Sequence, residues 1–240
     1  MTMRARLRDI LIIREKGGMR FELRVPSLDV YGGECLAVLG SSGCGKSTLL
    51  DVLALALKPC RAGRFLLYDE GGESDVPALS GAGLARLRGR HMGYVLQSGG
   101  LLSFLTVRDN ILLPGKLQGM GVEFLEKRLD RLASRLGIAE HLGKKPQHLS
   151  GGQRQRVAIA RALIHGPAMV LADEPTAAVD HKNAGEICAV FKEMVCESGA
   201  ALIMVSHDVE LARGIADRVV GFAVRNESSQ HVISTLYLER

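Results

Sequence analysis

A glycine-rich segment, GSSGCGKS at residues 40–47, restricts the fold of this chain more than any other feature. It matches the pattern G-x-x-x-x-G-K-[ST], follows the apolar run ECLAVLG, and leads into helix-forming residues from Lys46 onward. Glycines allow several backbone N–H groups to face one anion, and the following helix directs its positive end to the same point. The segment therefore predicts an α/β protein with a phosphate-binding loop between a buried strand and a helix.

The phosphate-binding loop and the first helical turn supply most of the predicted nucleotide contacts. Lys46 places a full charge near the β- and γ-phosphates, and the hydroxyl of Ser47 is left to coordinate Mg²⁺. The contacts are assigned to Gly40, Ser41, Ser42, Gly43, Cys44, Gly45, Lys46, Ser47 and Thr48.

A second carboxylate for Mg²⁺ is expected at the end of a neighbouring strand. Four apolar residues at 169–172 precede Asp173, which fits that position. Glu174 comes next, where a carboxylate orients or deprotonates the water that attacks the γ-phosphate. The alternative is that Glu174 only caps the following turn with Pro175.

Length and apolar patterning predict one domain over 1–240. A chain of 240 residues with 47% apolar residues buries roughly 70–75% of its unfolded surface, which is enough for one core. Alternation in the first thirty residues predicts an antiparallel pair that turns at Gly17-Gly18, and the helix from Lys46 is expected to continue to Pro59. Further strands are predicted at 64–68, before Gln97, and at 168–175, 200–208 and 217–224, with a helix at 184–196 and a final strand or edge hairpin at 225–240.

The segment 98–163 has a different pattern from the rest of the chain. We see two helical patterns and no β alternation between 101 and 163. The clearer pattern places five apolar side chains on one face before Gly137, namely Val122, Leu125, Leu129, Leu132 and Leu136. This predicts a helical subdomain at 98–163, inserted between β and phosphate-loop regions at 1–97 and 164–240.

Charge, cysteine content and hydropathy exclude several functions. The net charge of +5 is modest and the arginines are scattered, so we expect no nucleic-acid partner. Five cysteines without a C-x-x-C pair indicate reduced thiols. The apolar stretch at 10–13 is too short for a signal peptide and no run approaches the roughly 18 residues of a membrane span, so a membrane role would come through a partner.

The segment LSGGQRQRVAIARAL at 149–163 resembles the signature of ATP-binding-cassette (ABC) ATPases. The order of the other motifs is similar to that family over nearly the whole chain, with Gln97 at the glutamine loop, Asp180 at the D-loop and His207 at the switch histidine. The resemblance implies a RecA-like P-loop NTPase core with an N-terminal antiparallel β subdomain and an inserted helical signature subdomain.

The resemblance also implies ATP and Mg²⁺ as cofactors and a head-to-tail homodimer in the ATP state. In the family, the signature of one subunit closes over the nucleotide of another, here through Ser150, Gly151, Gly152 and Gln153. His207 would bind the γ-phosphate and hold Glu174 and water in line, and Asp180 would communicate across the interface. Gln97 would contact water and Mg²⁺ and sense movement of the helical subdomain.

The segment LLSFLTVRDNILLP at 101–114 resembles the small ABC ATPases of lipoprotein release, macrolide efflux and cell-division signalling. This subgroup implies integral membrane subunits, with a periplasmic domain, and a location on the cytoplasmic face of a bacterial inner membrane. The substrate or signal is met by those membrane subunits.

Two departures from the family pattern concern the nucleotide site. The aromatic residue that usually stacks on adenine is missing from 12–18, and Phe21 lies a few residues late, so Phe21 or an aliphatic contact would replace it. Cys44 occupies a variable position of the loop, where an ordinary thiol is favoured over a redox role.

Two other functions remain open at this point. A soluble ABC ATPase could act as an assembly scaffold, although the sustained coiled coils and cysteine clusters of several soluble relatives are missing. A degenerate sensor would bind ATP without turnover, which the intact Lys46, Asp173, Glu174 and His207 argue against.

Overall fold

The computed structural model describes residues 2–69, 71–177, 179 and 181–239, without the side chains of 181 and 182. The strands are β1 (Met3–Lys16), β2 (Met19–Tyr31), β3 (Cys35–Val38), β4 (Arg64–Asp69), β5 (Gly72–Asp75), β6 (Met92–Val95), β7 (Met169–Asp173), β8 (Ala201–Val205), β9 (Arg218–Ser228) and β10 (His231–Leu238). The α-helices are α1 (Lys46–Leu53), α2 (Gly81–His91), α3 (Val107–Leu117), α4 (Val122–Arg135), α5 (Gly151–Leu163), α6 (His181–Glu197) and α7 (Val209–Ile215). The predicted α/β class is confirmed.

The described strands form one sheet in the order β5-β4-β1-β2-β10-β9-β3-β8-β7-β6. Strands β9, β3, β8, β7 and β6 are parallel neighbours, and β1, β2, β4 and β5 are antiparallel. Gly17 and Gly18 have φ values of 57° and 78°, as both central residues of a type I′ hairpin turn require. The predicted antiparallel start with its turn at these glycines is therefore present.

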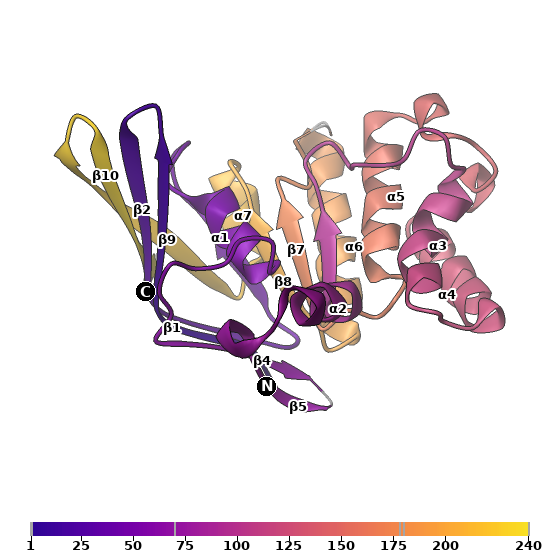
Figure 1. Cartoon of the computed structure of the whole chain (residues 1–240). Helices are drawn as coiled ribbons and strands as arrows, with labels where there is room; N and C mark the ends of the chain where they lie inside the picture. Colours follow the sequence, from indigo (N-terminus) through magenta and orange to yellow (C-terminus); the bar gives the residue numbers. More distant parts are fainter. Residues whose placement is uncertain (1, 70, 178, 180, 240) are drawn as a thin grey trace.

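The chain ends in strand β10, in agreement with the predicted final strand, but β10 lies in the interior of the sheet beside β9, so the alternative of an edge hairpin is wrong. β10 pairs with β9 in antiparallel and with β2 in parallel orientation, so it joins the antiparallel to the parallel half. Figure 1 shows β10 and β9 beside β2, although they lie at opposite ends of the chain. Residues 225–228 are exposed but belong to β9 and pair with β10, and residues 229 and 230 form the turn between the two strands.

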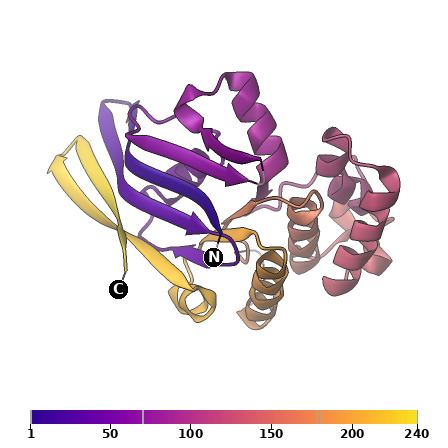
Figure 2. The ribbon, with the colours of Figure 1, turned by 90° about the horizontal axis from the view of Figure 1, so that it is seen from below.

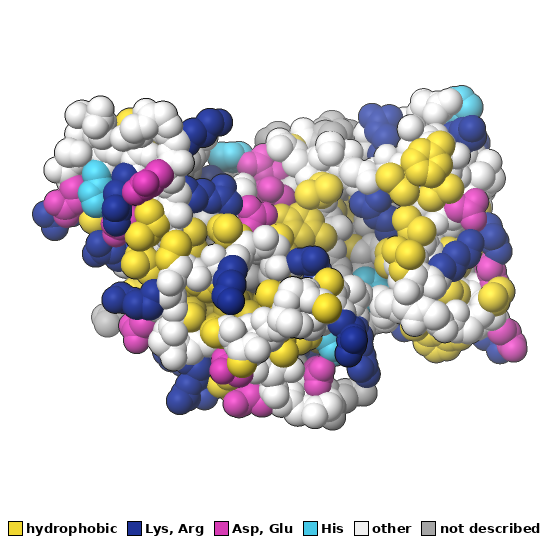
Figure 3. All heavy atoms as spheres, viewed as in Figure 1, with side chains coloured by type: hydrophobic (Ala, Val, Ile, Leu, Met, Phe, Trp, Pro, Cys, Tyr) yellow, Lys and Arg dark blue, Asp and Glu magenta, His cyan; other side chains and the backbone are white. Residues whose placement is uncertain are grey.

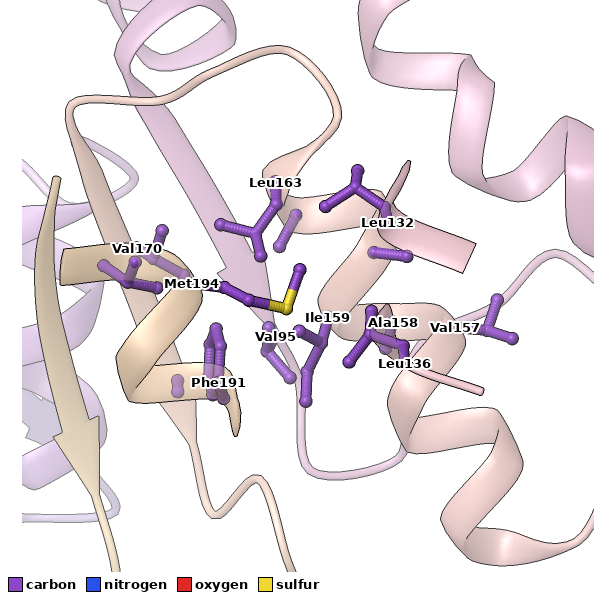
Figure 4. Packing of buried hydrophobic residues seen from close by; sticks show 14 of the residues in the cluster. Val95, Leu132, Leu136, Val157, Ala158, Ile159, Leu163, Val170, Phe191 and Met194 are labelled. Carbon is purple, nitrogen blue, oxygen red and sulfur yellow. The ribbon is translucent and has the colours of Figure 1, made fainter. Parts of the chain in front are cut away.

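Side-chain alternation along the parallel strands divides the interior into two cores. On β3, Leu36 and Val38 face the core shared with α1, β1 and β2, whereas Cys35 and Ala37 face the core shared with α5 and α6. Strands covered on both faces carry apolar residues at every position, which explains the unbroken apolar runs in the sequence. Figure 4 shows part of the second core, where Phe191 and Met194 of α6 meet Ile159 and Leu163 of α5.

The region 101–163 contains three α-helices, one more than the two patterns that were predicted. Pro114 lies inside α3, and because proline usually ends a helix it conceals this one in the sequence. Leu125, Leu129, Leu132 and Leu136 are buried as expected, but Val122 is 72% exposed because it is the first residue of α4. Figures 1 and 2 show α3, α4 and α5 as a lobe beside the sheet.

Helix α1 ends at Leu53, six residues before the predicted stop at Pro59. Leu55 has φ 57°, the N–H of Ala56 donates to the carbonyl of Asp51, and the N–H of Leu55 donates to that of Val52. These are the bonds of a Schellman motif, in which glycine normally takes the left-handed position. A leucine there gives no sequence signal for the helix end.

The described helices include none with both the length and the apolar composition needed to cross a bilayer.

Candidate active site

The phosphate-binding loop connects β3 to α1, as its sequence predicted. Gly43 and Gly45 have φ values of 79° and 109°, which only glycine adopts without strain. Lys46 is buried, with 7% of the residue exposed, and its ammonium group donates to the carbonyls of Gly40 and Ser41 over 2.7 and 3.0 Å. These bonds hold Lys46 against the loop, at the N-terminus of α1.

The topology of the sheet brings four distant sequence motifs to one edge. Strands β3, β8, β7 and β6 are parallel neighbours, so the residues that follow them gather at their carboxyl ends, where open α/β sheets bind ligands. Asp173 ends β7, Gln97 lies two residues after β6, and His207 lies two residues after β8. These positions lie on one side of the loop that follows β3, at the same edge of the sheet.

Glu174 is the centre of this group. Its Oε1 lies 2.6 Å from Nε2 of His207, and its Oε2 accepts a hydrogen bond of 3.2 Å from Nε2 of Gln97. The Glu174 side chain is 17% exposed, against 54% for His207. Glu174 is therefore in direct contact with His207 and Gln97, which were also predicted as catalytic, and its side chain does more than cap a turn.

The backbone of Glu174 adopts an unusual conformation. Its φ is 48°, in the left-handed region, which costs about 1–2 kcal/mol for a residue other than glycine. The Glu174 N–H donates to the carbonyl of Val205 on β8, and its carbonyl accepts from the N–H of Ala177. The strained turn directs the carboxylate toward His207 and Gln97, and such strain is concentrated at functional sites.

The residues around Asp173 have the oxygen donors that Mg²⁺ prefers. Burial, followed by the charges of Glu174 and Asp51, raises the pKa of Asp173, and a hydrogen bond from Ser47 opposes the rise. A half-buried carboxylate with acidic neighbours and a hydroxyl contact fits a cation. No group of three or more His, Cys, Asp or Glu side chains among the described residues could hold a metal ion.

The signature residues lie away from the loop of the same chain. α5 packs against α3, α4, α6 and β6, while α1 packs against β7, and Figure 1 shows α6 and β7 between α1 and α5. Ser150 caps α5: its Oγ accepts from the Gln153 N–H, and the Gln153 Oε1 accepts from the Ser150 N–H. The Gln153 amide also contacts His141. Gly151 and Gly152 are the first residues of α5, where backbone N–H groups have no acceptor within the helix.

Other predicted residues are placed as follows. Asp180 lies outside the described residues. Thr48 is buried in α1, Ser41 and Ser42 are exposed on the loop, and Cys44 is buried with a pKa that burial raises. All five cysteines are free thiols.

Sequence reasoning missed Asp51, which acts on Asp173 from α1 and pairs with Arg14. It lies four residues after Ser47, on the same helical face, so its spacing was a signal that could have been used. Phe21, the candidate for the adenine contact, lies next to the phosphate-binding loop. Its ring is 3.0 Å from the position that a Cβ on Gly45 would occupy.

Comparison with known proteins agrees with this geometry. Residues 23–177 match the family model described as ABC transporter. The chain is 40% identical over 213 residues to the macrolide export ATP-binding/permease protein MacB of Bradyrhizobium diazoefficiens, covering 87% of this chain and 32% of that protein. The protein of the same name from Wolinella succinogenes is 40% identical over 205 residues, covering 85% and 31%. The chain therefore spans about a third of the length of these curated relatives.

Solved structures show the same fold. A dimeric post-hydrolysis structure of the ATP-binding cassette MJ0796 with ADP and Pi has a TM-score of 0.78 and 31% identity, covering 90% of this chain and 93% of that one. CbiO1 from Clostridium perfringens, part of the ABC transporter complex cbiONQ, has a TM-score of 0.78 and 28% identity, covering 97% and 88%. The predicted P-loop core with its inserted helical lobe is confirmed, and the chain belongs to the ABC transporter family, as an ATP-binding domain.

Proposed function

We propose that this chain hydrolyses ATP with Mg²⁺ and that Glu174 positions the attacking water. The contact of Glu174 with both His207 and Gln97, beside the phosphate-binding loop, carries the proposal. A carboxylate held by two partners has a fixed direction, so it can orient a water and accept its proton as the water oxygen bonds to the γ-phosphorus.

The surrounding residues would supply charge and orientation. Lys46 and the backbone N–H groups of 40–47 bind the β- and γ-phosphates. Bound Mg²⁺ would neutralise charge that develops on those phosphates, held by Ser47, Asp173 and the amide oxygen of Gln97. The Gln97 amide nitrogen already donates to Glu174. A movement of the Gln97 amide oxygen would therefore also move the hydrogen bond that holds the water-positioning carboxylate.

A second copy of the chain would complete the nucleotide site. In one chain, the signature at 150–153 lies on the far side of α6 and β7 from the loop. Its helix N-terminus, capped by Ser150, has backbone donors for an anion that the chain's own loop does not supply. We therefore propose a head-to-tail dimer in the ATP state, and the solved structures of MJ0796 include dimers.

We also propose that the dimer serves membrane subunits with a periplasmic domain, in an efflux or lipoprotein-release complex at the cytoplasmic face of the inner membrane. The similar proteins named above are ATP-binding/permease proteins, which favours this function over a soluble scaffold. A groove of about 900 Å³ between α2 and β6 on one side and α3 and α5 on the other would receive the membrane partner. Figure 3 shows this side of the molecule hollowed between the sheet body and the helical lobe.

The groove has a chemistry that suits an acidic, amphipathic segment. Four arginines line it, namely Arg86, Arg88, Arg90 and Arg161. The guanidinium groups of Arg88 and Arg161 donate to backbone carbonyls, which leaves Arg86 and Arg90 without a carbonyl or carboxylate partner in the described part of the chain. Leu102, Leu113 and Leu117 add apolar surface. A helix with acidic and leucine-like side chains would match both features.

A pull-down tests the membrane complex. Tagged Glu174→Gln protein is incubated with ATP and Mg²⁺ and detergent-solubilised membranes of the source cell, and the retained proteins are identified. We expect an integral membrane subunit with a periplasmic domain, and its loss when Arg86 and Arg90 are both changed to Glu. Retention of soluble proteins alone, by a protein that forms an ATP-stabilised dimer, would favour the scaffold instead.

A further inference from the structure

Ser234 connects the C-terminal strand to the phosphate-binding loop. It lies in β10, is fully buried at 0% exposure, and donates a hydrogen bond of 2.5 Å from Oγ to the backbone carbonyl of Cys44. The two residues are 190 positions apart in the sequence. A buried hydroxyl keeps its hydrogen bond because leaving it unpaired is costly, so this bond fixes the direction of the Cys44 carbonyl.

The Cys44 carbonyl shares a peptide group with the N–H of Gly45. In a trans peptide these two groups point in opposite directions, and none of the described peptide bonds is cis. The bond to Ser234 therefore turns the Gly45 N–H away from β10. No acceptor in the described part of the chain takes this N–H, and Gly45 is the N-cap of α1.

Neighbouring strands hold the same loop from the same sheet. The Leu39 N–H donates to the carbonyl of Val220 on β9, and the Phe222 ring lies 3.1 Å from where a Cβ on Gly40 would stand. These contacts fix where the loop lies, whereas the Ser234 bond acts on the orientation of one peptide group. Position and orientation of the loop thus depend on strands that follow it by about 180 residues or more.

We propose that Ser234 is a positioning residue of the nucleotide site, which presents the Gly45 N–H to a phosphate oxygen by holding the Cys44 carbonyl. The inference rests on the proposed ATP hydrolysis. Because the Gly45 N–H would bind phosphate equally in the ground and transition states, its loss would weaken ATP binding and leave the chemical step unchanged.

The test compares Ser234→Ala with Thr235→Ala in steady-state ATP hydrolysis by the full chain. Thr235 is the next residue of β10 and is only partly buried, so its variant controls for changes in the strand. One neutral hydrogen bond contributes about 0.5–1.5 kcal/mol, so we expect the KM for ATP of Ser234→Ala to rise roughly two- to tenfold, with kcat within about twofold. Thr235→Ala should match the wild type.

A purely structural role gives a different result. It would lower the melting temperature of Ser234→Ala but leave KM and kcat of the folded fraction unchanged, and that outcome would overturn the inference. Ser234→Cys keeps nearly the same volume with a weaker donor, and it provides the same comparison if the alanine variant does not fold. Absence of turnover in the wild type would instead contradict the proposed function.

Discussion

Glu174 Oε1 and His207 Nε2 lie 2.6 Å apart. The two residues are 33 positions apart in the chain, and the paired strands β7 and β8 bring them together. The register Asp173↔Val205 sets this contact, because Glu174 and His207 each follow the paired strand ends by one or two residues. The contact with His207 orients a carboxylate that also accepts from Gln97. It is the structural basis of the proposed water-positioning role.

His207→Ala should reduce turnover while nucleotide binding is largely kept. Without the imidazole, the Glu174 carboxylate keeps the hydrogen bond from Gln97 as its side-chain contact within the described part of the chain, and it gains freedom to rotate. We expect kcat to fall at least about tenfold, since general-base catalysis contributes typically 10²–10⁴-fold. The affinity for ADP, which has no γ-phosphate, should stay within about threefold. An equal loss of ADP affinity would mean that His207 supports the whole site and not the water-positioning group.

Asp173→Asn should stabilise the nucleotide-free protein at neutral pH. Burial and neighbouring acids raise the pKa of Asp173, so its ionised form is less favourable in the folded than in the unfolded state. Neutral asparagine removes this cost, and a rise of roughly 2–4 °C in melting temperature would correspond to about 1 kcal/mol. The same variant should lose the Mg²⁺-dependent part of ATP binding. A lower melting temperature would contradict this account of the carboxylate.

Glu22, on the interior strand β2, makes the stability of the fold depend on acidic pH. Hydrogen bonds from Arg24 and Arg20 lower its pKa to about 2, from an ordinary 4.5. The stabilising contribution is therefore complete above pH 4.5 and is lost as the pH falls toward 2. Glu22→Gln should melt below the wild type at pH 6, and the difference should shrink at pH 3. Equal differences at both pH values would show that packing, not charge, is responsible.

Phe21 should support the adenine base in place of the missing aromatic residue. Its ring lies beside Gly45, at the start of α1. Phe21→Ala should weaken ATP binding up to about tenfold, since aromatic contacts contribute about 0.5–1.5 kcal/mol, while inorganic triphosphate should bind as before. Met19→Ala, at the exposed hairpin tip, is the matched control. Equal weakening for triphosphate would assign Phe21 to the loop alone.

Sequence could predict the parts of the site that are contiguous in the chain. The loop at 40–47 and the pair Asp173-Glu174 have local patterns, because glycine conformations and strand ends depend on neighbouring residues. The contact between Glu174 and Gln97 required the resemblance to a family and the register of β6 and β7. Nothing local indicated the Ser234 bond to Cys44 or the place of β10 between β2 and β9, since both depend on packing across the whole sheet.

Two local errors have the same physical origin. Leu55 ends α1 in a left-handed conformation that sequence rules reserve for glycine, and Pro114 lies within α3 where those rules predict an end. Leu55 is buried in the core with α1, and α3 packs against α5. Tertiary packing of these segments overrides the local preference of each residue.

Hydrolysis of ATP by wild-type and Glu174→Gln protein, with Mg²⁺ at saturating nucleotide, tests the central claim most directly. We predict turnover by the wild type, a loss of about 10²–10⁴-fold in the variant, and an ATP-stabilised dimer of the variant in size-exclusion chromatography. A wild type that binds ATP without turnover, and a variant that behaves identically, would contradict the account and indicate a nucleotide sensor.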